Sequence, residues 1–401
     1  MGTFDGDPST ETVEYEPVGV KDLLIAMKDG SELIVDLAYS ALLHNSTQLA
    51  EEVLALESRM DILQIQARMN LLMAVRKPKD AKQLAPVLAI VAATEKISNA
   101  AGDIATVVLE EEGLPRGIRA GLPEATEVLA RATLTADSDY AGRTLEDINL
   151  ETETGVRIIG VRTEDEWELE PTAKTRLDPG DVLLLRGGES SVSKVFETLT
   201  GEPYDRPEPV ETEIADLERA VDTIVLMKNV SELSVDLAYV SVLADDEQLA
   251  REVHSLEVEV DSLQARLEAW TLSAASEVDD PISLRGLLRL ANSAETISDA
   301  ALEITEGILR DIDMHPVIAE SVRESDVAVR RVPIAPGSAF DGVSVDQLVE
   351  AHPGVSVIAI HRQNDDWVFY PDGVETVGTD DVLIVRGTWD ATEELLAEVG
   401  A

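Results

Sequence analysis

The sequence contains no cysteine, only 3% aromatic residues and far fewer basic than acidic residues. Without cysteine, the chain can form neither a disulfide framework nor a thiolate metal site. Its 32 Lys and Arg against 79 Asp and Glu give a formal net charge of −47. Nucleic acid and anionic lipid surfaces are therefore expected to be poor partners.

Long apolar runs and common catalytic motifs are also missing. No run of about 18 apolar residues and no basic-then-apolar leader occurs, so we expect a cytoplasmic protein without direct membrane insertion. No P-loop, G-x-S-x-G elbow or G-x-G-x-x-G after a strand occurs, and the five His are scattered. The sequence therefore shows no nucleophile with a neighbouring base, which argues against a metal-dependent hydrolase.

The chain does contain one long internal duplication. Residues 27–57 align with residues 227–257 without a gap, with 18 identities in 31 positions. The offset of 200 continues through the two copies, ending with GDVLLLRG at 180–187 and DDVLIVRG at 380–387. The sequence therefore predicts two copies of one structural unit.

The spacing of apolar residues changes along each copy. The first part has apolar residues at helical spacing, such as Leu49, Val53, Leu56, Met60 and Leu63, which predicts three long helices in an antiparallel bundle. The second part has short apolar runs separated by turn signals such as DPGD, which predicts a small α+β domain.

The predicted fold class is therefore α+β, with two antiparallel helical bundles that alternate with two small α+β domains. With 44% hydrophobic residues, the chain can bury real cores. The predicted boundaries are 17–113 and 215–313 for the bundles, 117–202 and 316–401 for the α+β domains, and 203–214 for a linker rich in proline and acids.

The repeated segment SELIVDLAY (31–39) and SELSVDLAY (231–239) contains an acid pair in each copy. Glu32 and Asp36 lie four residues apart, so they project from one helix face among large apolar groups, as do Glu232 and Asp236. Such a pair needs a counter-charge, and a divalent or trivalent cation would supply it. The alternative is structural pairing with the lysine four residues earlier in each copy, or with Tyr39.

Further candidate residues lie outside this segment. Arg162 and Arg362 follow predicted strands, where they serve either as ligand-binding groups or as charges that protect an edge strand. The remaining candidate metal ligands are acids at helical spacing on the second and third helices: Glu57, Asp61, Glu257, Asp261, Glu295 and Asp299. Copy one has Asn99 where copy two has Asp299.

The helical part resembles a PhoU-type domain, on the acid-x-x-x-Asp motifs that begin at Glu57, Glu257 and Glu295. This resemblance implies bound metal clusters and a role in phosphate uptake or signalling. The α+β part resembles the C-terminal domain of TrkA and RCK potassium-transport regulators. The residues that carry this resemblance are Gly142, Leu145, Trp167 and Pro171 with the GD-V-L-x-x-x-G strand, and their counterparts in copy two.

The second resemblance implies a non-enzymatic, ligand-sensing regulator of potassium transport, with a cyclic dinucleotide as a candidate ligand. It also implies a membrane cation channel or transporter subunit as partner, and location at the inner face of the membrane through that partner. We expect the two TrkA-C domains to pair within one chain, with a homodimer as an alternative. A PhoU-type metal-binding regulator of phosphate uptake is the alternative function. The acidic composition resembles that of haloarchaeal proteins, in which molar salt screens the repulsion.

Overall fold

The structure is a computed structural model that describes most of the chain. The described residues are 19–110, 128–150, 154–163, 166–169, 171–187, 189–204, 214–278, 281–310, 312, 327–352, 354–364, 366–369, 371 and 373–399. Residues 205–213 of the predicted linker lie outside them.

The first copy begins with three antiparallel helices, as predicted. They are α1 (Val20–His44), α2 (Thr47–Ala74) and α3 (Pro78–Leu109). The tight turn between α1 and α2 forms because Asn45 adopts the left-handed region at φ 46°, and the Ser46 side chain caps α2 by accepting a hydrogen bond from the Leu49 amide. The predicted stripe on α2 faces the bundle interior.

The second bundle repeats this arrangement. It contains α7 (Ala215–Ala244), α8 (Glu247–Ala274) and α9 (Arg285–Leu309), with a short 3-10 helix η3 (Pro281–Leu284) before α9. Asp245 at φ 54° and the capping side chain of Asp246 form the same turn as Asn45 and Ser46. The duplication is therefore visible in the helix ends as well as in the cores.

Each bundle is followed by a four-stranded antiparallel sheet. In copy one, β1 (Val128–Thr133), β2 (Arg157–Thr163), β3 (Glu166–Leu169) and β4 (Val182–Gly187) lie in the order β1-β4-β2-β3, with α4 (Leu145–Ile148) and α6 (Glu189–Thr200). In copy two, β5 (Val327–Pro333), β6 (Val355–His361), β7 (Trp367–Phe369) and β8 (Val382–Thr388) lie in the order β5-β8-β6-β7, with α11 (Val345–Ala351) and α12 (Trp389–Val399).

The two faces of each sheet belong to different cores. In copy one, Leu129 and Leu184 face the helical bundle, whereas Leu183 and Leu185 face the core of the small domain together with Val192 of α6. This alternation follows from the two-residue period of a strand. The sheet therefore packs directly on α1 and α2, and the equivalent sheet packs on α7.

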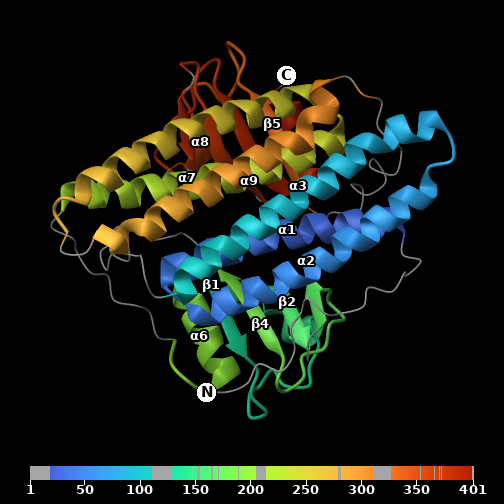
Figure 1. Ribbon diagram of the computed structural model, residues 1–401, viewed down its shortest axis with the longest axis vertical. Helices are drawn as coiled ribbons and strands as arrows, with labels where there is room; N and C mark the ends of the chain where they lie inside the picture. The colour runs from blue at the N-terminus through green and yellow to red at the C-terminus, as the bar shows by residue number, and fades with distance from the viewer. Residues whose placement is uncertain are drawn as a thin grey trace.

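The two bundles pair with each other, and the two sheet domains do not. Helix α3 packs against α9, and α1 packs against α7. Figure 1 shows the sheet domains on opposite sides of the paired bundles, and the two sheets share no extensive contact among the described residues. The predicted pairing of the two TrkA-C-like domains within the chain is therefore wrong. Each sheet covers its own bundle, which leaves the apolar faces of α3 and α9 to cover one another.

Helix α3 is the described helix that is long and apolar enough to cross a membrane, by length and composition alone. Of its most apolar window, 61% is buried inside the protein. This burial is what a core helix of the paired bundles requires.

Candidate functional site at the repeat interface

The repeated nine-residue segment forms the contact between the two copies. The Tyr39 hydroxyl lies 3.0 Å from Ser231 Oγ, and the Tyr239 hydroxyl lies 2.9 Å from Ser31 Oγ. Both hydrogen bonds are buried and join α1 to α7 in a reciprocal way, as at the two-fold interface of a homodimer. Tyr39 was one candidate partner for a carboxylate, and the structure instead directs it to a serine of the other copy.

One further hydroxyl makes the interface asymmetric. Thr94 Oγ1 of α3 lies 2.8 Å from the Tyr239 hydroxyl. The equivalent position in copy two is Ala294, which has no hydroxyl. The Tyr239 hydroxyl therefore lies beside two hydroxyl groups, whereas the Tyr39 hydroxyl contacts that of Ser231.

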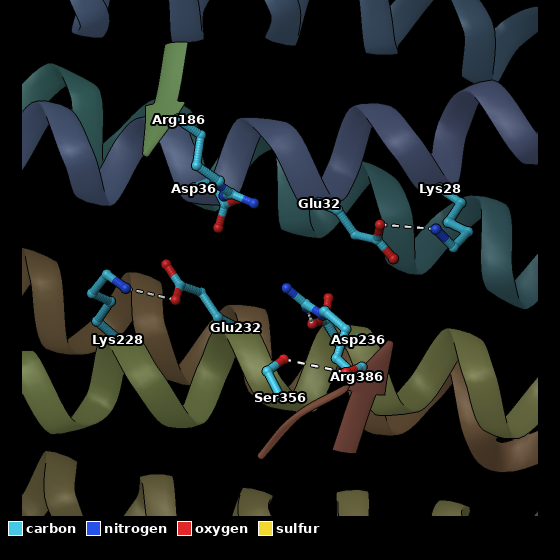
Figure 2. A network of polar contacts seen from close by, with 9 residues as sticks. All are labelled: Lys28, Glu32, Asp36, Arg186, Lys228, Glu232, Asp236, Ser356 and Arg386. Carbon is cyan, nitrogen blue, oxygen red and sulfur yellow. Dashed lines mark hydrogen bonds and ion pairs between the residues drawn. The ribbon is translucent and has the colours of Figure 1, made fainter. Parts of the chain in front are cut away.

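The four acids of the repeated segment face one another across the same interface (Figure 2). Lys28 Nζ lies 2.8 Å from Glu32, and Lys228 Nζ lies 2.6 Å from Glu232. These ion pairs within one helix are the structural alternative that the sequence left open.

The counter-charge for the two aspartates comes from the sheets. Arg186 of β4 forms an ion pair with Asp36, and Arg386 of β8 forms the equivalent pair with Asp236. The local pattern of the helix does not reveal these arginines, because they lie 150 residues further along the chain. The sequence does show that both copies have an arginine at this position, 200 residues apart, and this repetition was the signal that could have pointed to them.

The four acids of the repeated segment face four bases, and Asp29 adds a further carboxylate 3.5 Å from Lys28 Nζ. Burial raises the pKa of Glu32 to about 7, against the effect of Lys28 and with a contribution from Asp236. Burial alone would lower the pKa of Lys28, but Glu32 and Asp29 raise it above its ordinary value. Asp236 of one copy therefore acts on Glu32 of the other, so the charges of the two repeats are coupled.

These ion pairs weaken the argument for the predicted cation site. Lys28, Lys228, Arg186 and Arg386 already supply the counter-charge that the four acids need. No group of three or more His, Asp or Glu among the described residues is arranged to hold a metal ion. Metal binding by Glu32, Asp36, Glu232 and Asp236 stays a prediction.

The acids of α2 and α3 lie on another part of the first bundle. Glu57 is half-buried, and its carboxylate lies against Gly102 of α3. Burial, with repulsion from Asp61 and Asp103, raises the pKa of Glu57 to about 7. Burial and Glu95 also raise the pKa of Asp61. The absence of a side chain at residue 102 gives the Glu57 carboxylate its place between the two helices.

The equivalent acids of α8 and α9 also lie near one another. Burial and mutual repulsion raise the pKa of Glu257, Glu295 and Asp299, and Asp261 contributes to the shift of each. Leu302 stands where copy one has Gly102. The structure thus brings the predicted acids together in both copies, in two different surroundings, and leaves metal binding there a prediction.

The first predicted ligand-binding residue, Arg162, joins the sheet to the bundle. Its Nη2 lies 2.7 Å from Oε1 of Glu52 on α2, a buried carboxylate that also accepts a hydrogen bond from Nε of Arg131 at 2.8 Å. The Arg162 guanidinium lies over the Trp167 ring, 5.8 Å from its centroid. Sequence reasoning did not single out Glu52, although it is identical in both copies.

Arg162 and Arg362 are not equivalent, because the strands shift by one residue. Arg162 pairs with Val182 and Trp167, and the residue that pairs with Val382 and Trp367 is His361. His361 Nδ1 lies 2.8 Å from Glu252, so it takes the place of Arg162.

Arg362 instead forms ion pairs with Asp381 and Glu375 within its own domain. Strands β2 and β6 are also internal to their sheets, so the alternative interpretation of these arginines as edge-strand charges is wrong. Ligand binding by Arg162 and Arg362 stays a prediction.

Comparison with known families matches four segments in alternation. Residues 24–108 and 224–308 match the PhoU domain, and residues 129–200 and 329–400 match the TrkA-C domain. No curated protein matches the sequence. Together the four segments account for both bundles and both sheet domains.

Solved structures of both kinds show distant similarity. PhoU from Pseudomonas aeruginosa is 15% identical, with a TM-score of 0.42, over 76% of this chain and 96% of its own. The GsuK RCK domain is 15% identical, with a TM-score of 0.19, over 70% of this chain and 65% of its own. The GsuK channel bound to NAD is 16% identical, with a TM-score of 0.20, over 71% of this chain and 56% of its own. The chain thus spans less than two thirds of the two GsuK chains.

Proposed function

The chain is a tandem PhoU and TrkA-C domain protein, and on that premise we propose that it is a ligand-sensing regulator of potassium or other cation transport, without enzymatic activity. Both domain types are regulatory. The proposed partner is a membrane cation channel or transporter subunit, which the protein contacts from the cytosolic side. A cyclic dinucleotide on the TrkA-C domains is the candidate ligand.

One observation supports this proposal above the others. Each TrkA-C domain is joined by an arginine to the helix that forms the repeat interface, through Arg186 and Asp36 in copy one and Arg386 and Asp236 in copy two. A ligand that moves β4 or β8 therefore changes the charge balance between the bundles. Such a coupled two-site arrangement is what allosteric control requires.

The test combines ligand titration with hydrogen exchange. Cyclic di-adenylate and other nucleotides are titrated into the purified chain by calorimetry, and amide exchange in α1 and α7 is compared with and without ligand. We expect a nucleotide to bind and to change exchange in both helices. In the R186Q/R386Q variant, binding persists and the change in α1 and α7 is lost.

Absence of nucleotide binding would remove the cyclic dinucleotide from the proposal, and binding without any change in α1 or α7 would refute the coupling.

The transport partner is tested separately. Affinity capture from solubilised membranes in high salt should recover a cation channel or transporter subunit with the wild-type chain. Recovery of phosphate-uptake components instead would favour the alternative function.

The alternative, a metal-binding regulator of phosphate uptake, rests on the acids of α8 and α9. Burial, and after it repulsion between the carboxylates, raises the pKa of Glu257, Glu295 and Asp299, and a bound cation would relieve the repulsion. Metal analysis of the wild-type chain and of the E257Q/E295Q variant tests it. Equal, negligible metal content in both chains would count against this function.

A further inference from the structure

The turn between α2 and α3 exposes apolar and basic side chains together. We call residues 72–82 the basic tip. Leu72 is 69% exposed and Met73 is 65% exposed, and Val75 is 38% exposed. The exposed basic residues beside them are Arg76, Lys77, Lys79 and Lys82. Exposed apolar groups next to basic residues mark an interaction surface rather than an ordinary solvated loop.

The charge of this region is opposite to that of the chain as a whole. Residues 62–94 contain a single acid, Asp80, and five basic residues, in a chain with 79 acids among 401 residues. Asp80 accepts hydrogen bonds from the backbone amides of Arg76 and Lys77, so it caps α3. The four basic side chains of the tip therefore form a local positive surface on an acidic protein.

We propose that the basic tip binds the anionic surface of a lipid bilayer, with Leu72 and Met73 in the interfacial layer and the basic side chains at the headgroups. Clustered Lys and Arg beside exposed apolar side chains are the two elements that such binding combines. This inference does not depend on the proposed ligand or on the identity of the transporter.

The shape of the tip favours lipid over a protein partner. A stable protein interface buries about 800 Å² on each partner, over a surface of some 20 residues. The basic tip is the convex end of a two-helix hairpin, at one end of the molecule in Figure 1, and offers far fewer residues. A bilayer accepts protruding side chains without a complementary surface.

The net charge of −47 does not oppose this contact at the tip. Helix α2 has 28 residues, so the tip lies as much as ~42 Å from the start of the helix. Screening at physiological ionic strength acts over about 8 Å, so acids beyond that range contribute little there, and Asp22, in the first turn of the antiparallel α1, lies at the same end of the bundle as the tip. The whole protein is a poor partner for anionic lipid, and the tip is the exception.

Copy two provides an internal comparison. Leu272, the counterpart of Leu72, is 68% exposed, and Ile282 is 69% exposed. Residues 262–294 nevertheless contain four acids and three basic residues, so the apolar exposure is retained without the positive charge. The α8–α9 tip lies at the other end of the molecule (Figure 1), so lipid binding would hold the protein by one end.

The test is co-sedimentation of the full chain with vesicles of pure phosphatidylcholine and with vesicles that contain phosphatidylglycerol. The salt series covers concentrations at which circular dichroism shows the folded protein. We expect sedimentation with the anionic vesicles, weakening with salt. The K77Q/K79Q variant should lose about 25-fold in partition, since each basic residue near the surface contributes about fivefold.

The apolar contribution has a matched control. The L72S/M73S variant should lose about tenfold or more in partition, whereas L272S/I282S should bind as the wild type does. Equal sedimentation with both vesicle types, or K77Q/K79Q binding as tightly as wild type, would overturn the proposal. Self-association in ultracentrifugation that K77Q/K79Q abolishes, without vesicle binding, would assign the tip to an acidic protein surface and also overturn it.

Discussion

The asymmetry of the tyrosine contacts at the repeat interface gives a quantitative prediction. Tyr39→Phe removes one hydrogen bond, to Ser231, which keeps its own bond to the Lys228 carbonyl. Tyr239→Phe removes two contacts, to Ser31 and Thr94. A buried hydrogen bond contributes about 1 kcal/mol net, so the free energy of unfolding should fall by about 1 kcal/mol in the first variant. In the second variant it should fall by more than this but by less than about 2 kcal/mol, because the Tyr239 hydroxyl has a single hydrogen to donate, and Ser31 and Thr94 keep their own bonds to the Lys28 and Ile90 carbonyls.

Thr94→Ala provides the control, because copy two already has Ala294 at this position. In the Thr94→Ala background, Tyr239→Phe should lose its extra effect and cost about as much as Tyr39→Phe. Equilibrium denaturation followed by circular dichroism measures the difference, with variants compared at equal m-values. A cost for Tyr39→Phe equal to or above that for Tyr239→Phe in the wild-type background would refute the reasoning.

Three further predictions concern the carboxylates. Glu52→Gln should weaken the contact between the first sheet domain and its bundle, because it removes the buried charge that both Arg131 and Arg162 contact, at a cost of about 2–4 kcal/mol; faster amide exchange in residues 129–200 measures it. The pKa of Glu57 is raised to about 7, so its charged form opposes folding. Stability should therefore fall as pH rises from 4.5 to 7, by less than the full shift implies because water screens a half-buried carboxylate, and Glu57→Gln should remove this dependence; unchanged pH dependence of melting in that variant would contradict it. Gly102→Ala places a methyl group where the Glu57 carboxylate lies, so it should push the carboxylate towards water and lower its pKa, as followed by NMR titration.

Glu252 offers a contrasting pH dependence in copy two. Burial alone would raise the pKa of Glu252, but hydrogen bonds from His361 and Arg331 hold it below its ordinary value. Its stabilising contribution is therefore present above the ordinary glutamate pKa and is lost as pH falls below it.

The fold could be predicted because it depends on local periodicity and on the internal repeat. The helical stripes, the strands at β2 and β4 and the alternation of two domain types all follow from patterns within about 30 residues. Strand β1 was not predicted, because VLARAT has no alternation strong enough to distinguish it. The four acids of the repeated segment were expected to lie among apolar groups and to need a counter-charge, and the structure shows both features.

The lysines that pair with Glu32 and Glu232 were the structural alternative left open by the sequence, and the structure shows these pairs. The partners of the two aspartates could not be predicted, because Arg186 and Arg386 reach them through tertiary packing. The expectation that Arg162 and Arg362 occupy equivalent positions in the two copies was wrong for a related reason. The two copies differ by one residue between this strand and the tryptophan that follows it, and strand register depends on the whole sheet. His361, rather than Arg362, is therefore the residue that holds the second sheet to its bundle.

In a homodimer, every substitution appears on both sides of the symmetry axis. Here the two halves are covalently one gene product, so Thr94 can act on Tyr239 without any counterpart acting on Tyr39. Dilution cannot separate the halves, and drift can alter either of them alone. Two sheet domains that began as copies are thus free to diverge while both remain paired with one shared cluster of charges.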